Sequence, residues 1–249
     1  MKPVERAAYV IGILLILSGL VHVAVLLATG GSWSGPLSLR KPATFGLSFG
    51  LTLINLTVIA SLMSLSHRMR TALIGVFAAA CVVETFLVSM QAWRGVPSHF
   101  NMETRFDAAV AVTLAIGGFT LVVVVVALAV SAIRHPPRLP AAFRSAIQAG
   151  LLALVGAQIA GAIMIATGVR LVVGGNPALA YATGGWLKPV HGLLMHGILV
   201  LPMLGWLVSN LRWTERAQTR AMTAAIVAYT LVTTGAAIDA VITAAATPR

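Results

Sequence analysis

Seven long apolar runs constrain the fold of this chain more than any other feature of its sequence. They lie at about residues 7–29, 42–65, 71–91, 108–133, 145–168, 188–209 and 220–243. A helix needs about 20 mostly apolar residues to cross the hydrocarbon core of a bilayer, and each run is long enough. None alternates polar and apolar residues with a period of two, which argues against a β-barrel. The sequence therefore predicts an all-α fold, a polytopic integral membrane bundle of seven transmembrane helices in a single domain 1–249.

Composition and charge narrow the class of protein further. Charged residues make up 9% of the chain, whereas a soluble domain carries about 25%. The net charge of +11 comes from lysines and arginines in the segments between the apolar runs, where they complement anionic lipid head groups. No continuous basic patch with interleaved aromatic residues is present, so nucleic acid is excluded as a partner and the lipid bilayer is expected. The single cysteine, Cys81, excludes an intrachain disulfide bond.

The distribution of basic residues predicts the orientation. Lysines and arginines are more numerous at the N-terminus and after the second, fourth and sixth runs than in the other loops. Basic loops stay on the cytoplasmic side, so the sequence predicts a cytoplasmic N-terminus and a multi-pass protein of a bacterial inner membrane. The outer loops then hold Trp33, Trp93 and Trp186, as interfacial anchors or as walls of a site.

An internal repeat is visible in the sequence. The aligned ranges are 6–30 with 144–168 and 39–42 with 186–189, within halves of about 6–91 and 144–243. The alignment makes Gly12 equivalent to Gly150 and Gly50 equivalent to Gly197. Four runs separate the two copies of the first helix, so both copies point the same way. This predicts a parallel 3+1+3 plan with the fourth run as connector, and parallel repeats occur in transporters.

Polar residues interrupt the sixth apolar run within residues 185–197. Lys188, His191 and His196 fall there, and an ionisable group at membrane depth costs about 2.5–3.5 kcal/mol on insertion scales. The two histidines are five residues apart, which places them about 140° apart around a helix. We therefore expect that they do not chelate one ion together. Lys41 and Lys188 each precede a proline, and for Lys41 a helix start is the favoured explanation.

Five ionisable side chains from four runs are predicted to share one depth in the outer half of the membrane. They are His22, Glu84, His191, His196 and Asp239, placed by a rise of about 1.5 Å per residue. Each alone has an ordinary structural explanation, such as a backbone hydrogen bond for a histidine or a buried ion pair for an acid. Their common depth favours a functional site.

The segment 91–107 is predicted to lie above this band of polar residues. It is rich in polar and aromatic side chains, and Trp93, Arg94 and His99 are its candidate binding residues. Loops held on a rigid scaffold often carry function. An ordered loop without chemistry is the alternative.

Haem is the first cofactor that these residues suggest. A b-type haem between membrane helices takes two axial imidazoles from different helices, and His22 with His191 or His196 would supply them. Trp93, Arg94 and His99 would help to hold the cofactor, and quinone would be a natural redox partner. Retinal is excluded because the seventh run has no lysine for a Schiff base.

The sequence is also compatible with two other functions. A divalent metal ion would be held by His22, His196 and Glu84, and imidazole with carboxylate suits zinc, iron or manganese. A membrane-embedded metal-dependent hydrolase is one form of this hypothesis. The other function is a small-solute or proton-coupled transporter built on the repeat. Glu84, Asp239 and Lys188 are the candidate catalytic or proton-carrying groups.

Two segments carry a resemblance to other proteins. Residues 93–101, Trp-Arg-Gly-Val-Pro-Ser-His-Phe-Asn, and the stretch 185–197 resemble segments of uncharacterised bacterial multi-pass membrane proteins. The resemblance implies no activity, cofactor or site residue. The His-x-x-x-His pair of ceramidase-like and adiponectin-receptor-like seven-helix zinc enzymes is absent from the sequence.

Overall fold

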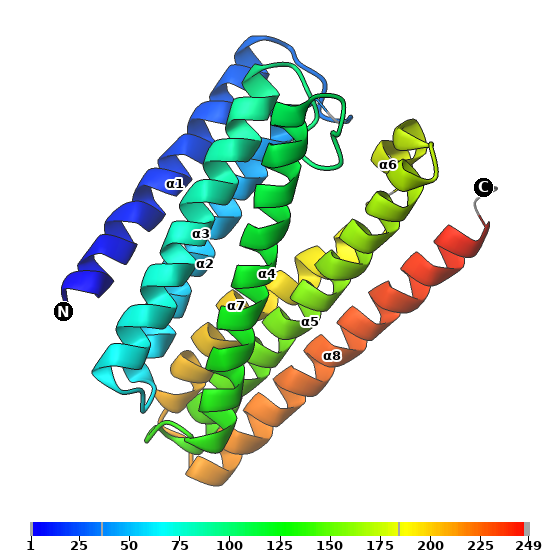
Figure 1. Cartoon of the computed structure of the whole chain (residues 1–249). Helices are drawn as coiled ribbons and strands as arrows, with labels where there is room; N and C mark the ends of the chain where they lie inside the picture. Colours follow the sequence, from blue (N-terminus) through cyan, green and yellow to red (C-terminus); the bar gives the residue numbers. More distant parts are fainter. Residues whose placement is uncertain (1, 36, 184, 247–249) are drawn as a thin grey trace. The chain divides into compact units, whose positions relative to one another are not determined.

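Helices account for nearly all of the regular structure. The computed structural model describes residues 2–35, 37–183 and 185–246, and in these ranges it has no strand (Figure 1). The helices are α1 Pro3–Ala28, α2 Arg40–Leu62, α3 His67–Trp93, α4 Arg105–Arg134, α5 Ala141–Val173, α6 Pro177–Thr183, α7 Lys188–Ser209 and α8 Glu215–Ala246. All except α6 are long and apolar enough to cross a membrane. The predicted all-α bundle of seven membrane-spanning helices is confirmed, and the chain is a multi-pass membrane protein.

The helices are longer than most of the apolar runs from which they were predicted. α5 continues to Val173, past the predicted end at residue 168, because Arg170 can lie along the helix and extend its charged head to the interface. α6 was not predicted. It has 7 residues, which is too short to form a hydrophobic run of its own.

Local sequence signals explain where the helices begin and end. Ser66 precedes α3, and its side chain accepts a hydrogen bond from Met69 N, which satisfies one of the free amides of the first turn. At the other end of α3, Gly95 has a φ of 69°, and Val96 N donates to Gln91 O at 3.1 Å. Glycine adopts this left-handed conformation without strain, so the chain leaves α3 in a tight turn.

The chain divides into two compact units. Unit 1 comprises Met1–Ser61, Leu65–Val124 and Leu171–Ala182, and unit 2 comprises Leu62–Ser64, Val125–Arg170 and Thr183–Arg249. Unit 1 therefore contains α1, α3, nearly all of α2 and α6, and the first part of α4. Unit 2 contains the rest of α4, most of α5, α7 and α8.

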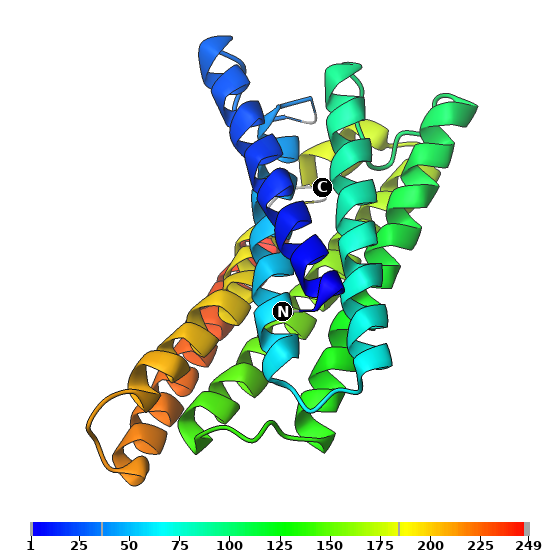
Figure 2. The ribbon, with the colours of Figure 1, turned by 90° about the vertical axis from the view of Figure 1, so that its left-hand side faces the viewer.

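Glycines allow α1 and α2 to pack closely in unit 1, where the two helices cross (Figure 2). A Cβ atom added to Gly46 would lie 2.6 Å from Leu15 O, and one added to Gly50 would lie 2.5 Å from Gly12 O. α1 also contacts α3. Small residues at such crossings are typical of membrane helices, because packing rather than the hydrophobic effect holds these helices together.

The helices of unit 2 pack in a similar way. A Cβ atom added to Gly150 of α5 would lie 3.1 Å from Gly197 O of α7. α7 contacts α8, and Tyr229 of α8 donates its hydroxyl to Leu193 O of α7 at 2.5 Å. A partly buried hydrogen bond to a backbone carbonyl stabilises the pair of helices, because lipid offers the hydroxyl no other partner.

The glycines that the repeat makes equivalent occupy equivalent contacts. Gly12 meets Gly50 between the first two helices of unit 1, and Gly150 meets Gly197 between α5 and α7 of unit 2. A duplicated scaffold would produce this correspondence. The repeat stays a prediction, and these contacts support it.

The α1–α2 crossing gives a first testable expectation. Gly46→Ala places a methyl group against the backbone of α1, which cannot move aside as a flexible side chain would. Overpacking of this kind should lower the free energy of unfolding by about 1 kcal/mol or more. Gly75→Ala on α3 is the matched control, because an added Cβ there meets nothing within 4 Å. Thermal unfolding in detergent measures both variants, and equal melting temperatures would contradict the expectation.

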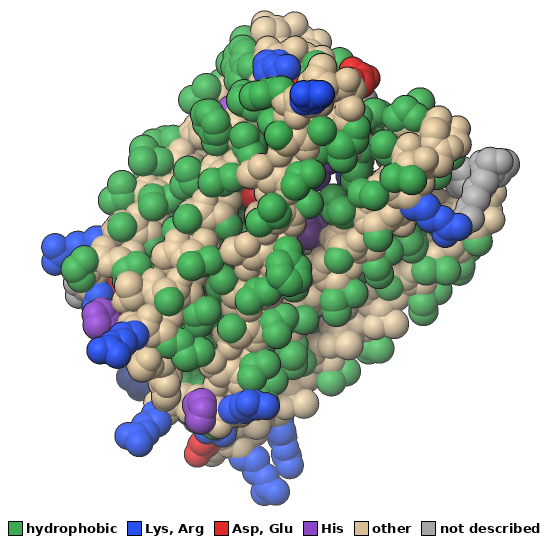
Figure 3. Space-filling view, viewed as in Figure 1, with side chains coloured by type: hydrophobic (Ala, Val, Ile, Leu, Met, Phe, Trp, Pro, Cys, Tyr) green, Lys and Arg blue, Asp and Glu red, His purple; other side chains and the backbone are tan. Residues whose placement is uncertain are grey.

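Side chains are sorted as a membrane environment requires. Hydrophobic side chains cover much of the visible face, and lysine and arginine side chains gather toward the helix ends (Figure 3). Exposed apolar residues lie along the spanning helices, among them Leu14, Phe86 and Phe119. A water-soluble surface would not carry so many of them, and lipid is their natural environment.

Candidate functional site

The first polar group lies at one end of unit 1, where α1 and α3 finish and α2 and α4 begin. We call this the outer end, after the predicted orientation. His22 of α1 is buried, with 5% of its surface exposed. Its Nδ1 lies 2.8 Å from Ser18 O, and Trp93 of α3 donates Nε1–H to its Nε2 at 3.1 Å. Because a carbonyl oxygen only accepts, the proton sits on Nδ1 and Nε2 accepts. Both ring nitrogens of His22 are therefore in use.

A second polar group joins α2 to the loop between α3 and α4. Lys41 Nζ lies 3.0 Å from His99 Nδ1, and Ser98 Oγ lies 3.1 Å from the same nitrogen. A lysine ammonium can only donate, so His99 Nδ1 accepts and the proton sits on Nε2. Removal from water and the positive charge of Lys41 hold the pKa of His99 well below its usual value. His99 is thus neutral and offers one N–H donor.

Aromatic rings lie beside His99. Phe45 of α2 lies edge-on to His99, with ring centroids 5.9 Å apart. Phe49, one turn deeper on α2, is 5.2 Å from Phe45. Phe100 is 6.1 Å from His99 on the loop side. The neighbourhood of His99 combines a cation and an N–H donor with apolar, aromatic walls.

Glu84 of α3 is the third polar group of unit 1. Its side chain is buried, with 3% of its surface exposed, and at about 1.5 Å per residue it lies roughly 13 Å from the outer end of α3. The carboxyl group packs against Gly117 of α4, where any side chain would overlap it. Its Oε1 has no hydrogen-bond partner among the described residues, and Lys41 attracts it electrostatically. We call Lys41, Glu84 and His99 the outer site.

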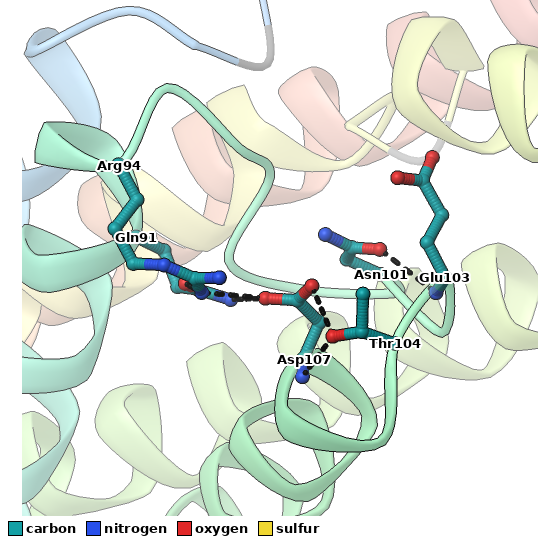
Figure 4. A network of polar contacts seen from close by, with 6 residues as sticks. All are labelled: Gln91, Arg94, Asn101, Glu103, Thr104 and Asp107. Atoms are coloured by element: carbon teal, nitrogen blue, oxygen red, sulfur yellow. Dashed lines mark hydrogen bonds and ion pairs between the residues drawn. The ribbon is translucent and has the colours of Figure 1, made fainter.

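A closed hydrogen-bond network holds the loop that carries His99 (Figure 4). The buried carboxylate of Asp107, in the first turn of α4, accepts from Gln91 Nε2 at 2.9 Å, from Arg94 Nη1 at 2.6 Å and from Thr104 Oγ1 at 2.6 Å. Arg94 also donates to Gln91 Oε1 and lies over the ring of Phe106. The network ties the end of α3 to the start of α4. Arg94 therefore positions the loop instead of facing a ligand.

The candidate residues of unit 2 lie apart from one another. His191 is partly buried, and its Nδ1 lies 2.7 Å from Ala157 O of α5. His196 is exposed, and its Nδ1 lies 2.6 Å from Gly192 O within α7. The two histidines point to different surroundings, as their spacing predicted. Lys188 and Asp239 are exposed.

The structure brings together some of the predicted site residues. His22 joins Trp93, and Glu84 lies within electrostatic reach of Lys41, which bonds His99. Among the described residues, no three His, Cys, Asp or Glu side chains converge on a point that could hold a metal ion. From the sequence, Lys41 was expected to mark a helix start, and Phe45 and Gly117 were not predicted to belong to a site. The Lys-Pro pair was the only signal that could have singled out Lys41.

Comparisons with known proteins found no protein similar to this chain. No protein-family model, curated protein or solved structure matches the chain. The class of protein is therefore defined by the fold and the polar groups alone. It is a multi-pass helical membrane protein with a buried acid and a lysine–histidine pair near one end of a helical unit.

Proposed function

We propose that the protein is a proton-coupled transporter of a small solute in a bacterial inner membrane, with the outer site as the place where proton and solute meet. One observation carries the proposal. Glu84 is buried at membrane depth with one carboxyl oxygen unpartnered among the described residues, and it is within electrostatic reach of Lys41. Acidic residues inside membrane helices mark proton relays and substrate pathways.

The surroundings of Glu84 suit a group that gains and loses a proton. A buried carboxyl group with full hydrogen bonding would be held in one state, as Asp107 is. Glu84 has a backbone hydrogen bond from Gly118 of α4, leaves Oε1 without a partner among the described residues, and has Lys41 within electrostatic reach. An acid inside a membrane helix with an unpartnered carboxyl oxygen can take up or release a proton as its surroundings change. Lys41 and His99 then extend the polar path toward the outer end.

The geometry favours transport over haem or metal binding. Those hypotheses give His22 a central part as ligand, and both of its ring nitrogens already have partners. Trp93 would have to move away before Nε2 could bind iron or another metal. An absorption spectrum with metal analysis of the purified protein tests this directly. A haem Soret band that is lost in His22→Ala would overturn the preference.

Proteoliposomes that enclose a pH-sensitive dye test the transport proposal. Amino acids, sugars and short-chain carboxylates are added outside in turn, and the internal pH is followed. We expect at least one class of solute to acidify the interior and Glu84→Gln to abolish the effect, because glutamine cannot release a proton. Glu103→Gln removes an exposed acid of the same unit and should leave the effect intact. If no class of solute moves protons, or if Glu84→Gln behaves like the unaltered protein, the proposal fails.

A further inference from the structure

We propose that the solute is a small soluble carboxylate with a compact aromatic or apolar body, and that its carboxylate competes with Glu84 for Lys41. This inference rests on the proposed transport function and names the substrate class of the same site. It follows from three properties of the outer end of unit 1: the donors gathered there, the aromatic rings beside them, and the position of Glu84.

Hydrogen-bond donors gather around Lys41 and His99 at the outer end of unit 1. Lys41 has three N–H groups, and His99 in its neutral form presents Nε2–H because Nδ1 accepts from Lys41. Arg40, next to Lys41, has a buried Nε without a hydrogen-bond partner among the described residues. The first turn of α2 adds the positive end of the helix dipole. Donors with positive charge fit a ligand group that only accepts and is negative, and a carboxylate is such a group.

Aromatic side chains supply the surface for the rest of the solute. Phe45, Phe49 and Phe100 form a row with the ring of His99, with successive centroids 5.2 to 6.1 Å apart. Rings in this edge-on arrangement also accept a further ring or a compact apolar group. A sugar or a highly polar solute would leave these walls without a matching surface. The combination therefore fits an acid such as benzoate.

Few other charged groups compete in the outer half of unit 1. The titratable and charged side chains on the helices and the loop of this part of unit 1 are His22 on α1, Arg40 and Lys41 on α2, Cys81 on α3, Arg94, His99 and Glu103 after α3, and Arg105 and Asp107 on α4. Asp107 binds Arg94, and both ring nitrogens of His22 are engaged. Glu103 is exposed. Glu84 is thus the buried acid that can take the charge of Lys41 away from a ligand.

Competition for one lysine would couple the solute to a proton. When Glu84 is protonated, its carboxyl group no longer attracts the ammonium of Lys41, and the solute carboxylate can bind that ammonium instead. When Glu84 loses its proton, its own carboxylate attracts Lys41 and the bound anion leaves. One proton and one anion are therefore taken up and released together, so the pair carries no net charge across the membrane. The sign is fixed: binding strengthens as pH falls.

Calorimetric titration of the purified, detergent-solubilised full chain tests the inference with benzoate and its neutral counterpart benzamide. We expect benzoate to bind more tightly at about pH 6 than at about pH 8, although benzoate itself stays ionised at both, as carboxylates do. Benzamide should not bind. Glu84→Gln should bind benzoate with the same affinity at both values, because its side chain stays neutral. Lys41→Gln should weaken binding about tenfold or more.

Two controls keep the result interpretable. Lys41→Arg retains the charge and should keep most of the affinity, which separates loss of binding from loss of folding. Arg105→Gln removes an exposed positive charge of the same unit and should leave the affinity unchanged. Palmitate is tested in parallel. Tighter binding of palmitate than of benzoate would indicate that the ligand is a membrane fatty acid and would overturn the proposal of a small soluble carboxylate.

The remaining outcomes separate this inference from the transport proposal. Equal binding of benzamide, or pH-dependent binding that survives in Glu84→Gln, would overturn the competition for Lys41. If benzoate does not bind, but another class of solute drives proton movement in proteoliposomes, the carboxylate is not the substrate and the transport proposal still holds. If benzoate binds as expected but moves no protons, the binding site stands and transport fails.

Discussion

Asp107→Ala is expected to unfold the outer end of unit 1 and to abolish solute-driven proton movement. The substitution removes the acceptor shared by Gln91, Arg94 and Thr104. It leaves the buried side-chain amide of Gln91 without its acceptor, and a buried donor without a partner costs about 1–3 kcal/mol. The partly exposed guanidinium of Arg94 also loses its anion. We expect the melting temperature in detergent to fall by about 5 °C or more. The loop would then no longer hold His99 beside Lys41.

Two further variants separate the loss of the network from the loss of the site. Asp107→Asn keeps one acceptor oxygen for Gln91 or Thr104 and should be less destabilised than Asp107→Ala. Thr104→Val removes the hydroxyl that donates to the Asp107 carboxylate and accepts from Asp107 N at the start of α4, and it should also be less destabilised than Asp107→Ala. A melting temperature of Asp107→Ala within about 1 °C of the unaltered protein would show that the network does not hold the loop.

Most of the fold follows from hydrophobicity alone. Seven runs of membrane-spanning length predicted seven helices, and each run contains the body of one observed spanning helix. The separation of His191 and His196 also followed from helical geometry, because a spacing of five residues cannot place two side chains on one face. α6 could not be predicted, since a helix of 7 residues leaves no periodic signal of its own.

The outer site could be predicted only in part. The sequence singled out Glu84 and His99 as polar residues at an unusual depth or in an unusual loop. It did not connect them through Lys41, because the contact between Lys41 and His99 joins residues 58 positions apart. That contact depends on the course of the loop, which the hydrogen bonds of Asp107 hold in place. Pairings that depend on several side chains at once leave no periodic signal in the sequence.

The partners of His22 could not be predicted from the sequence either. Its depth in the membrane suggested a ligand, but the decisive fact is what its two nitrogens contact. Ser18 O, one turn earlier on α1, was within reach of any histidine at this position. Trp93, which completes the set, comes from the far end of another helix. Depth indicates that a polar residue needs partners, and only the packed helices determine which partners it has.

Acid should destabilise the folded protein through His99. Burial and the charge of Lys41 hold the pKa of His99 in the fold well below its usual value, whereas in the unfolded chain it returns to about 6.5. Above about pH 6.5 both states are neutral at this residue, and stability does not change with pH on its account. As pH falls below that value, His99 binds a proton in the unfolded chain but stays neutral in the folded protein. The free energy of unfolding should then drop by at most about 1.4 kcal/mol per pH unit.

Thermal unfolding in detergent between about pH 7 and pH 5 measures this slope. His99→Asn keeps an acceptor for Lys41 and cannot be protonated, so its melting temperature should fall less steeply over the same range. Lys41→Gln removes one of the two causes of the shift and should give an intermediate slope. If His99→Asn loses stability with acid as steeply as the unaltered protein, another group is responsible. The neutral histidine, and with it the Nε2–H donor that the outer site offers to an anion, would then lose its support.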